Sequence, residues 1–141
     1  MNPILKDILA VFTGLIVGSI VNMGIIMVSS GVIPPPPGGD STTMEGLNAT
    51  MHFFEPRHFI FPFLAHAIGT LVGAFIAARI ASTRKMTMAL VIGFFFLIGG
   101  ISNVMMLSSP TWFTIVDLGL AYIPMALLGG TLGIARRKIP M

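Results

Sequence analysis

Four apolar stretches dominate this chain, and each is long enough to cross a lipid bilayer as an α-helix. A transmembrane helix needs about 20 apolar residues, whereas a transmembrane β-strand needs a short segment in which apolar and polar residues alternate. None of the stretches alternates in that way, so the sequence predicts an all-α membrane protein with a single integral membrane domain over residues 1–141. The expected spans cover approximately residues 8–30, 59–81, 87–107 and 112–135.

The composition supports this prediction and excludes several classes of protein. Charged residues make up 9% of the chain and the mean hydropathy is +0.94, whereas soluble domains carry about 25% charged residues. The absence of cysteine excludes disulfides, thiolate metal sites and a cysteine nucleophile. The formal net charge of +3 comes from a few residues at the ends of the apolar stretches. That placement is typical of membrane topology and not of nucleic-acid binding.

Short connections and the placement of basic residues predict the topology. Residues 82–86 and 108–112 leave room only for tight turns, so the helices should form an antiparallel four-transmembrane-helix bundle. Basic residues mark the cytoplasmic side of a membrane protein, and all except Arg57 fall at one end of the bundle. Both termini are therefore expected in the cytoplasm, with the first span kept as an uncleaved signal anchor. The basic residues at that end are Lys6, Arg79, Arg84, Lys85, Arg136, Arg137 and Lys138.

Residues 31–58 form the one long connection, which is expected on the outer side. Four successive prolines, Pro34–Pro37, cannot continue a helix and should end the first span abruptly. The segment Met51–Phe54 is expected to lie at the level of the lipid headgroups as a short interfacial helix. The tripeptide Asn48-Ala49-Thr50 fits a glycosylation sequon, although matches to three residues often arise by chance.

A repeated phrase in the first and third spans suggests an internal duplication. GSIVNM at residues 18–23 and GGISNV at residues 99–104 each place an asparagine four residues after a glycine. The second and fourth spans share a fainter echo, LAHAIG against LAYIPM. Two duplicated helical hairpins in the same orientation would be related by an axis along the membrane normal. Chance resemblance between apolar helices is the alternative.

Each span carries one polar residue in its outer half: Asn22, His66, Asn103 and Asp117. With a rise of 1.5 Å per residue, all four lie about 6–12 Å below the outer ends of their helices. Each shares a helix face with glycine, alanine or threonine, and small residues at such spacing let helices approach closely. A polar group that faces lipid stays unsatisfied, whereas one that faces the bundle interior can find a partner. We therefore expect His66 to point inward, toward Asp117 or one of the asparagines.

Two interpretations of this polar layer stay open. In the first, an outward-facing pocket binds a small ligand, a lipid headgroup or a proton. His66 and Asp117 would then be the ligand-binding or proton-handling pair, and Asn22 and Asn103 would orient the ligand as hydrogen-bond donors. In the second, the four side chains bond one another and simply hold the bundle together. Three residues near the surface would form the pocket mouth in the first interpretation: Glu55, Arg57 and His58.

Other kinds of function make different demands on the sequence. An accessory or scaffold subunit of a larger membrane complex would use its small-residue faces and its outer loop to bind partner helices. A channel or transporter would need a homo-oligomer, since four helices rarely enclose a path alone, and the inner halves of the spans carry no comparable polar residues. No nucleophile, base and acid stand at a motif spacing, so we expect no enzyme.

A metal or another cofactor is not expected either. His58 and His66 are eight residues apart, which separates them by about 12 Å along one helix, so they cannot share one ion. A zinc or haem site at His66 would need ligands from other helices, and only Asp117 offers a strong one.

The phrases HFIFPFLAHAIGTLVG and TWFTIVDLGLAYIPMALLGG, together with the IPPPPGG loop, resemble a group of small uncharacterised bacterial membrane proteins with four transmembrane helices. The likeness covers nearly the whole chain and implies a multi-pass protein of the bacterial inner (plasma) membrane. It implies no activity, because no established function is attached to that group.

Overall fold

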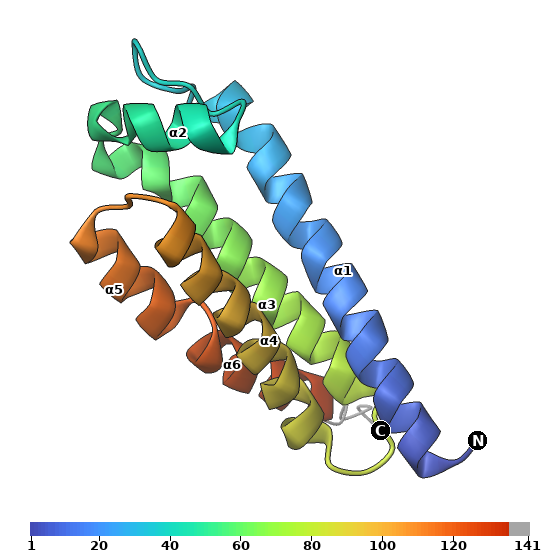
Figure 1. The fold of residues 1–141 in the computed structure, drawn as a ribbon. Helices are drawn as coiled ribbons and strands as arrows, with labels where there is room; N and C mark the ends of the chain where they lie inside the picture. The colour runs from blue at the N-terminus through green and yellow to red at the C-terminus, as the bar shows by residue number, and fades with distance from the viewer. Residues whose placement is uncertain (136–141) are drawn as a thin grey trace, which may run out of the picture.

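The fold was obtained as a computed structural model, which describes residues 1–135 and contains helices but no strand in that range. Arg136, Arg137 and Lys138, on which the predicted orientation partly depends, lie outside the described residues. Within the described range, six α-helices and two 3₁₀ turns follow one another along the chain (Figure 1). Their bounds are α1 Pro3–Val32, α2 Met44–Thr50, η1 Met51–Phe53, η2 Pro56–Phe59, α3 Ile60–Ile80, α4 Lys85–Met106, α5 Thr111–Leu120 and α6 Ile123–Ile134.

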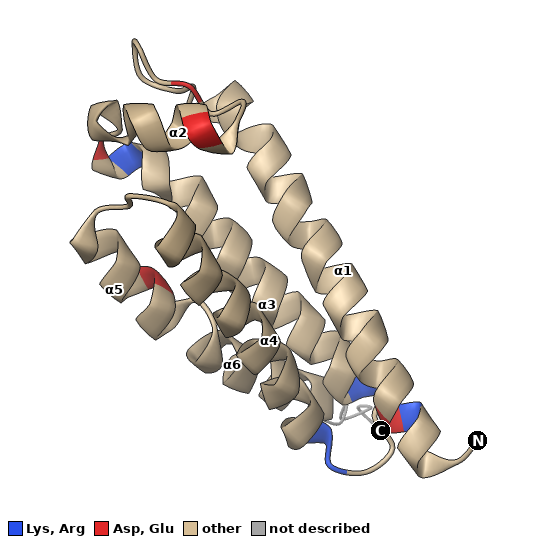
Figure 2. Cartoon of the chain, viewed as in Figure 1, with Lys and Arg blue, Asp and Glu red and all other residues tan. Residues whose placement is uncertain are grey.

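Helix α3 lies at the centre of the bundle and packs against α1, α4 and α6 (Figure 1). Helix α1 leans mainly on α3 and only lightly on α4. The short α2 lies across one end of the bundle, which we call the loop end. The opposite end, which holds the start of α1 and the α3–α4 turn, we call the basic end because Lys6, Arg79, Arg84 and Lys85 gather there (Figure 2).

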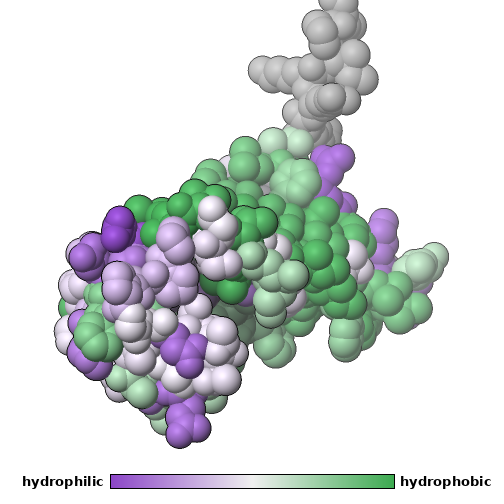
Figure 3. Space-filling view, turned by 90° about the horizontal axis from the view of Figure 1, so that it is seen from above, coloured by the Kyte–Doolittle hydropathy of each residue, from purple (hydrophilic) through white to green (hydrophobic). Residues whose placement is uncertain are grey.

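In the part of the chain that the structure describes, four segments are long and apolar enough to cross a membrane: α1, residues 56–80, α4 and residues 111–134. Large apolar side chains cover much of their outer surface, for example Ile16 at 58% and Met27 at 73% exposure. Seen from the loop end, hydrophilic and neutral residues gather over the tip of the molecule, and the flank behind is strongly hydrophobic (Figure 3). This distribution is that of a helical bundle with a polar cap and apolar sides.

Small residues bring α1 and α3 into backbone contact. A Cβ atom added to Gly73 would lie 2.7 Å from the carbonyl oxygen of Gly14, and one added to Gly18 would lie 2.7 Å from that of Gly69. The predicted inward faces of the first and second spans are therefore confirmed. The core beside them is built largely from alanine, with Ile92 as its largest fully buried aliphatic side chain.

The repeated phrase does not correspond to repeated packing. Gly18 is buried against α3. Gly99, which occupies the equivalent position in the second copy of the repeated sequence, is exposed, and nothing lies within 4 Å of an added Cβ. The neighbouring Gly100 is the buried position on α4, and it packs against the ring of Tyr122. The prediction that Gly99 faces the bundle interior is therefore wrong, and duplication of the hairpins stays a prediction.

The helix bounds agree with three of the four predicted spans, and the fourth is interrupted. Helix α1 extends the first span to Pro3 and ends at Val32, immediately before the proline run, as expected. The predicted span over residues 112–135 is not continuous, because α5 stops at Leu120 and α6 starts at Ile123. Pro124 stands in the first turn of α6, where it cannot donate to the carbonyl of Leu120.

Residues 31–58, the long connection at the loop end, are held by hydrogen bonds to their own backbone and to the bundle. The side chain of Thr43 accepts a hydrogen bond from Gly46 N and caps α2. The Asn48 side chain donates to Met106 O and accepts from Ser108 N at 2.8 Å, so it joins α2 to the α4–α5 turn. Both the nitrogen and the oxygen of the Asn48 side-chain amide are hydrogen-bonded, so this residue of the sequon has a structural role.

The predicted interfacial helix begins earlier than expected and one of its residues is buried. Helix α2 starts at Met44, and Met51–Phe53 continues it as a 3₁₀ turn. Met51 is 7% exposed and packs with Phe59 and Phe113. The Met51 side chain thus fills the end of the bundle, and the position of this segment at the level of the lipid headgroups stays a prediction.

Candidate functional site

A cavity of about 410 Å³ lies at the loop end, beneath α2, and its walls come from α1 to α5. Met44 and Leu47 of α2 and Met23 and Ile26 of α1 belong to its apolar lining, which also includes Phe54, Phe59, Leu107 and Phe113. Polar side chains on its wall include one from each of α1, α3, α4 and α5. These four are Asn22, His66, Asn103 and Asp117, beside His58, Ser109 and Thr114, and we call this space the polar cavity.

His66 and Asp117 meet inside the bundle. His66 Nδ1 lies 2.8 Å from Asp117 Oδ1, with side-chain exposures of 17% and 4%. The position of His66 follows from α3, where Gly69, Thr70 and Gly73 share its face and are all buried. Thr70 donates its hydroxyl hydrogen bond to the carbonyl of His66, which keeps this polar residue satisfied within the helix. The expectation that His66 points inward toward Asp117 is confirmed.

Tyr122 completes this cluster, and the sequence analysis did not identify it as a site residue. Its hydroxyl donates to Asp117 Oδ2 at 3.0 Å, and its ring stacks on that of His66 with a centroid distance of 5.8 Å. Tyr122 stands in the break between α5 and α6, where the interrupted helix turns the ring toward α4 and Gly100. A sequence signal existed, because the only tyrosine of the chain lies within a predicted span, five residues after Asp117.

The two hydrogen bonds at Asp117 bear on which nitrogen of His66 carries the proton. With Asp117 as a carboxylate, Oδ2 accepts from Tyr122 and Oδ1 accepts from His66, so the Nδ1 atom of the imidazole carries the proton. The Nε2 atom then offers a lone pair, and it has no hydrogen-bond partner in residues 1–135. This is the arrangement in which a carboxylate orients a histidine whose other nitrogen is free to accept.

Asn22 and Asn103 reach the cavity but do not join this network. Neither side-chain amide forms a hydrogen bond with another side chain or the backbone within the described part of the chain. Asn22 is half-buried on α1, and Asn103 is exposed on α4. The interpretation in which all four polar residues bond one another therefore fails for the asparagines. Only His66 and Asp117 form a direct pair.

The three residues predicted at the pocket mouth separate into two groups. Glu55 and Arg57 form an exposed ion pair at 3.1 Å and are not among the residues that line the polar cavity. His58 does line it, and its Nδ1 atom accepts a hydrogen bond from Glu55 N at 2.9 Å. The Nε2 atom of His58 is buried and has no partner among residues 1–135. A neutral His58 must carry its hydrogen on Nε2, which makes this atom a free donor.

The donor set does not suit a metal ion. Within residues 1–135, no group of three histidine, cysteine or acidic side chains lies close enough to hold one. Only His66 and Asp117 pair closely, and Asp117 is already occupied by Tyr122. The arrangement fits recognition of an organic molecule better, since it combines a few polar groups with an extensive apolar wall.

Comparison with known proteins gives no further guide to the site: no protein-family model, curated protein or solved structure matches the chain.

Proposed function

We propose that this protein resides in the bacterial inner membrane and binds a small organic ligand in the polar cavity, with both termini in the cytoplasm and the loop end outside. The observation that supports this most is the pair of amides of Asn22 and Asn103, which face the cavity without a partner in the described chain. Side chains that merely held helices together would be paired with each other. Unpaired donors and acceptors on an otherwise apolar wall are what a ligand with a few polar groups requires.

The two ends of the polar cavity suit an amphipathic ligand. His58 Nε2–H offers a donor near the loop end, so the ligand should carry an acceptor oxygen there. His66 Nε2 lies about two helical turns deeper and offers an acceptor when the ring is neutral. Phe59, Leu107 and Phe113 line the same cavity and supply apolar surface for the hydrocarbon part of the ligand. A lipid headgroup with part of its chain, or a small amphipathic metabolite, meets this description.

A cavity-filling substitution tests the proposal without touching the polar groups. Val104 lines the polar cavity, whereas Val28 is an exposed valine on α1 and serves as a control for the same change. The full-length protein would be purified in mild detergent from the membrane of its source organism, and bound small molecules would be extracted and identified by mass spectrometry. We expect one specific molecule to co-purify in stoichiometric amount with wild type and with Val28→Phe. The amount of this molecule that co-purifies with Val104→Phe should be at least tenfold lower.

Two results would count against the proposal. The first is wild-type protein that carries no molecule beyond bulk lipid. The second is a molecule that Val104→Phe retains as fully as Val28→Phe, because the ligand would then be bound elsewhere. If the molecule is found, Asn103→Leu and His66→Phe should each weaken its retention, since each removes a polar group from the wall.

A further inference from the structure

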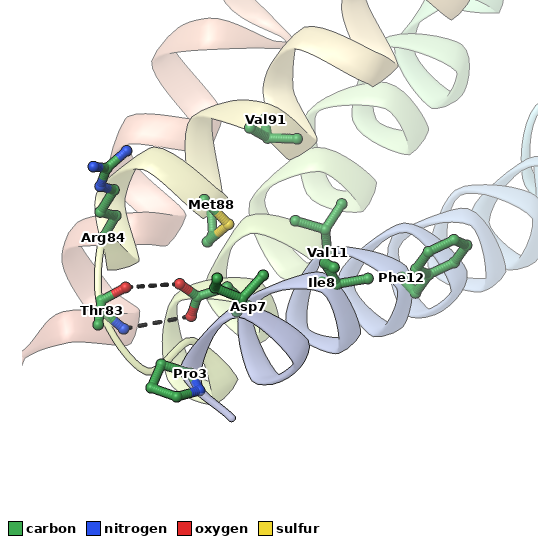
Figure 4. A pocket seen from close by; sticks show the side chains of 10 residues that line it. Pro3, Asp7, Ile8, Val11, Phe12, Thr83, Arg84, Met88 and Val91 are labelled. Carbon is green, nitrogen blue, oxygen red and sulfur yellow. Dashed lines mark hydrogen bonds between the residues drawn. The ribbon is translucent and has the colours of Figure 1, made fainter. Parts of the chain in front are cut away.

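A second cavity lies at the basic end, between the start of α1 and the start of α4, far from the polar cavity. Its volume is about 700 Å³, and we call it the α1–α4 groove. Ile8, Val11 and Phe12 form one wall, and Met88 and Val91 form the other (Figure 4). Pro3, Ile4, Asp7, Thr83 and Arg84 close its lower part. The groove is therefore apolar along its length and polar at one end.

Two contacts fix α1 beside this groove. Asp7 accepts a hydrogen bond from Ser82 N at 2.6 Å, which ties α1 to the α3–α4 turn. It also accepts one from the Thr83 hydroxyl at 2.7 Å (Figure 4). Further along α1, Gly14 packs against the backbone of Gly73 on α3. The start of α1 is thus tied to the α3–α4 turn, and α1 packs on α3 just beyond the groove.

The polar end of the groove carries an excess of positive charge. Asp7 is the acidic residue there, and its carboxylate is occupied by the α3–α4 turn. Arg84 lines the groove and has no acidic partner within 4.0 Å among residues 1–135. Lys6, Arg79 and Lys85 lie at the same end (Figure 2). An occupant should therefore have an anionic group at this end and an apolar part that extends along the helices.

The length of the groove suits one leaflet of a bilayer. From Pro3 to Phe12 the axis of α1 rises about 13 Å, which is close to half of the roughly 30 Å hydrocarbon core. We propose that the α1–α4 groove binds an anionic phospholipid of the cytoplasmic leaflet, with an acyl chain against Ile8, Phe12 and Val91 and the headgroup phosphate near Arg84. Basic pockets between transmembrane helices on that side are suited to such headgroups. The inference depends on the proposed membrane setting and not on the polar cavity.

Native mass spectrometry of the full-length protein in detergent can test this, with phosphatidylglycerol and phosphatidylcholine of identical acyl chains as probes. Wild type should bind the first phosphatidylglycerol more tightly than phosphatidylcholine. Arg84→Gln should reduce that preference about fivefold, the contribution of one basic residue at an anionic surface. Arg79→Gln is the matched control, because Arg79 is at the same end but does not line the groove, and it should keep the preference.

A substitution in the apolar wall tests the position of the acyl chain. Val91→Trp should fill the groove and weaken binding of both lipids, and water-soluble glycerol phosphate should not compete with phosphatidylglycerol in wild type. The proposal is overturned if wild type shows no preference, if Arg79→Gln and Arg84→Gln lose it equally, or if glycerol phosphate competes. If wild type is a dimer and Val91→Trp is a monomer, the groove binds a second copy of the chain, and the lipid proposal is overturned as well. Loss of lipid preference in Arg84→Gln should leave the ligand of the polar cavity bound, so the two proposals can fail independently.

Discussion

His66 Nδ1 lies 2.8 Å from Asp117 Oδ1, although 51 positions separate the two residues in the chain. Both are nearly enclosed by the bundle, and they join α3 to α5. Contacts between helices in a membrane gain little from the hydrophobic effect, because lipid tails are as apolar as the core. A polar pair between helices therefore matters for how α5 is placed against α3.

Removing this pair should reveal a direct energetic coupling. In a double-mutant cycle with His66→Ala and Asp117→Ala, we expect a coupling of about 1–2 kcal/mol, near the upper end for polar contacts between membrane helices. The free energy of unfolding can be measured by steric trapping in bicelles. The exposed pair Glu55 and Arg57 provides the control cycle, with an expected coupling of about 0–1 kcal/mol. Equal coupling energies in the two cycles would contradict the claim that burial strengthens the contact between His66 and Asp117.

Tyr122 should stabilise the bundle through its hydroxyl as well as its ring. Tyr122→Phe keeps the stacking on His66 but leaves Asp117 Oδ2 without its donor, and the loss of such a buried hydrogen bond costs about 1–3 kcal/mol. Tyr122→Ala would in addition leave a void beside Gly100, so it should be the more harmful change. Thermal unfolding in detergent compares the two variants. A wild-type midpoint for Tyr122→Phe would show that the hydroxyl contributes nothing.

The residues of the candidate site could be predicted because the physics of lipid is simple. A polar side chain in an apolar span must turn inward, and small residues on the same face indicate which direction is inward. This reasoning was sufficient for His66 and Asp117, which pair inside the bundle, and for the half-buried Asn22, whereas Asn103 stays exposed although it lines the same cavity. It could not show that Asn22 and Asn103 would stay unpaired, because hydrogen bonding depends on distances of a few tenths of an ångström between helices.

The features that were missed depend on local backbone geometry. The break between α5 and α6 turns Tyr122 into the interior, and the proline alone predicts a kink without its direction. The aromatic and charged residues around Met51 indicate an interfacial segment, but they do not show that the preceding helix α2 directs its side chain onto Phe59 and Phe113. Likewise, Gly99 and Gly100 are indistinguishable in sequence, and only the rotation of α4 decides which one is buried.

The contact between α1 and α3 should be intolerant of even one added methyl group. In Gly73→Ala, the new Cβ would lie 2.7 Å from the carbonyl oxygen of Gly14, and backbone on both sides prevents a local adjustment. We expect a loss of about 1–3 kcal/mol in the free energy of unfolding. Gly24→Ala is the control in the same bundle, because nothing lies within 4 Å of its added Cβ. That change should be neutral or stabilise α1 by up to about 1 kcal/mol, and equal losses in both variants would refute the close-packing argument.

The outer loop should respond to acid through Asp40. Hydrogen bonds from the hydroxyl and the backbone N–H of Thr42 lower the pKa of this carboxyl below its ordinary value of 3.8. Because the pKa is lower in the folded loop, the stabilisation by these bonds is fully present above pH 3.8 and is lost as the pH falls through the folded value. The carboxyl resonance of Asp40, followed by NMR in detergent between pH 6 and 2, should therefore titrate below the ordinary value of 3.8. Thr42→Ala removes the leading cause and should return the pKa of Asp40 toward 3.8. An unchanged titration in that variant would show that the threonine hydroxyl does not hold the loop.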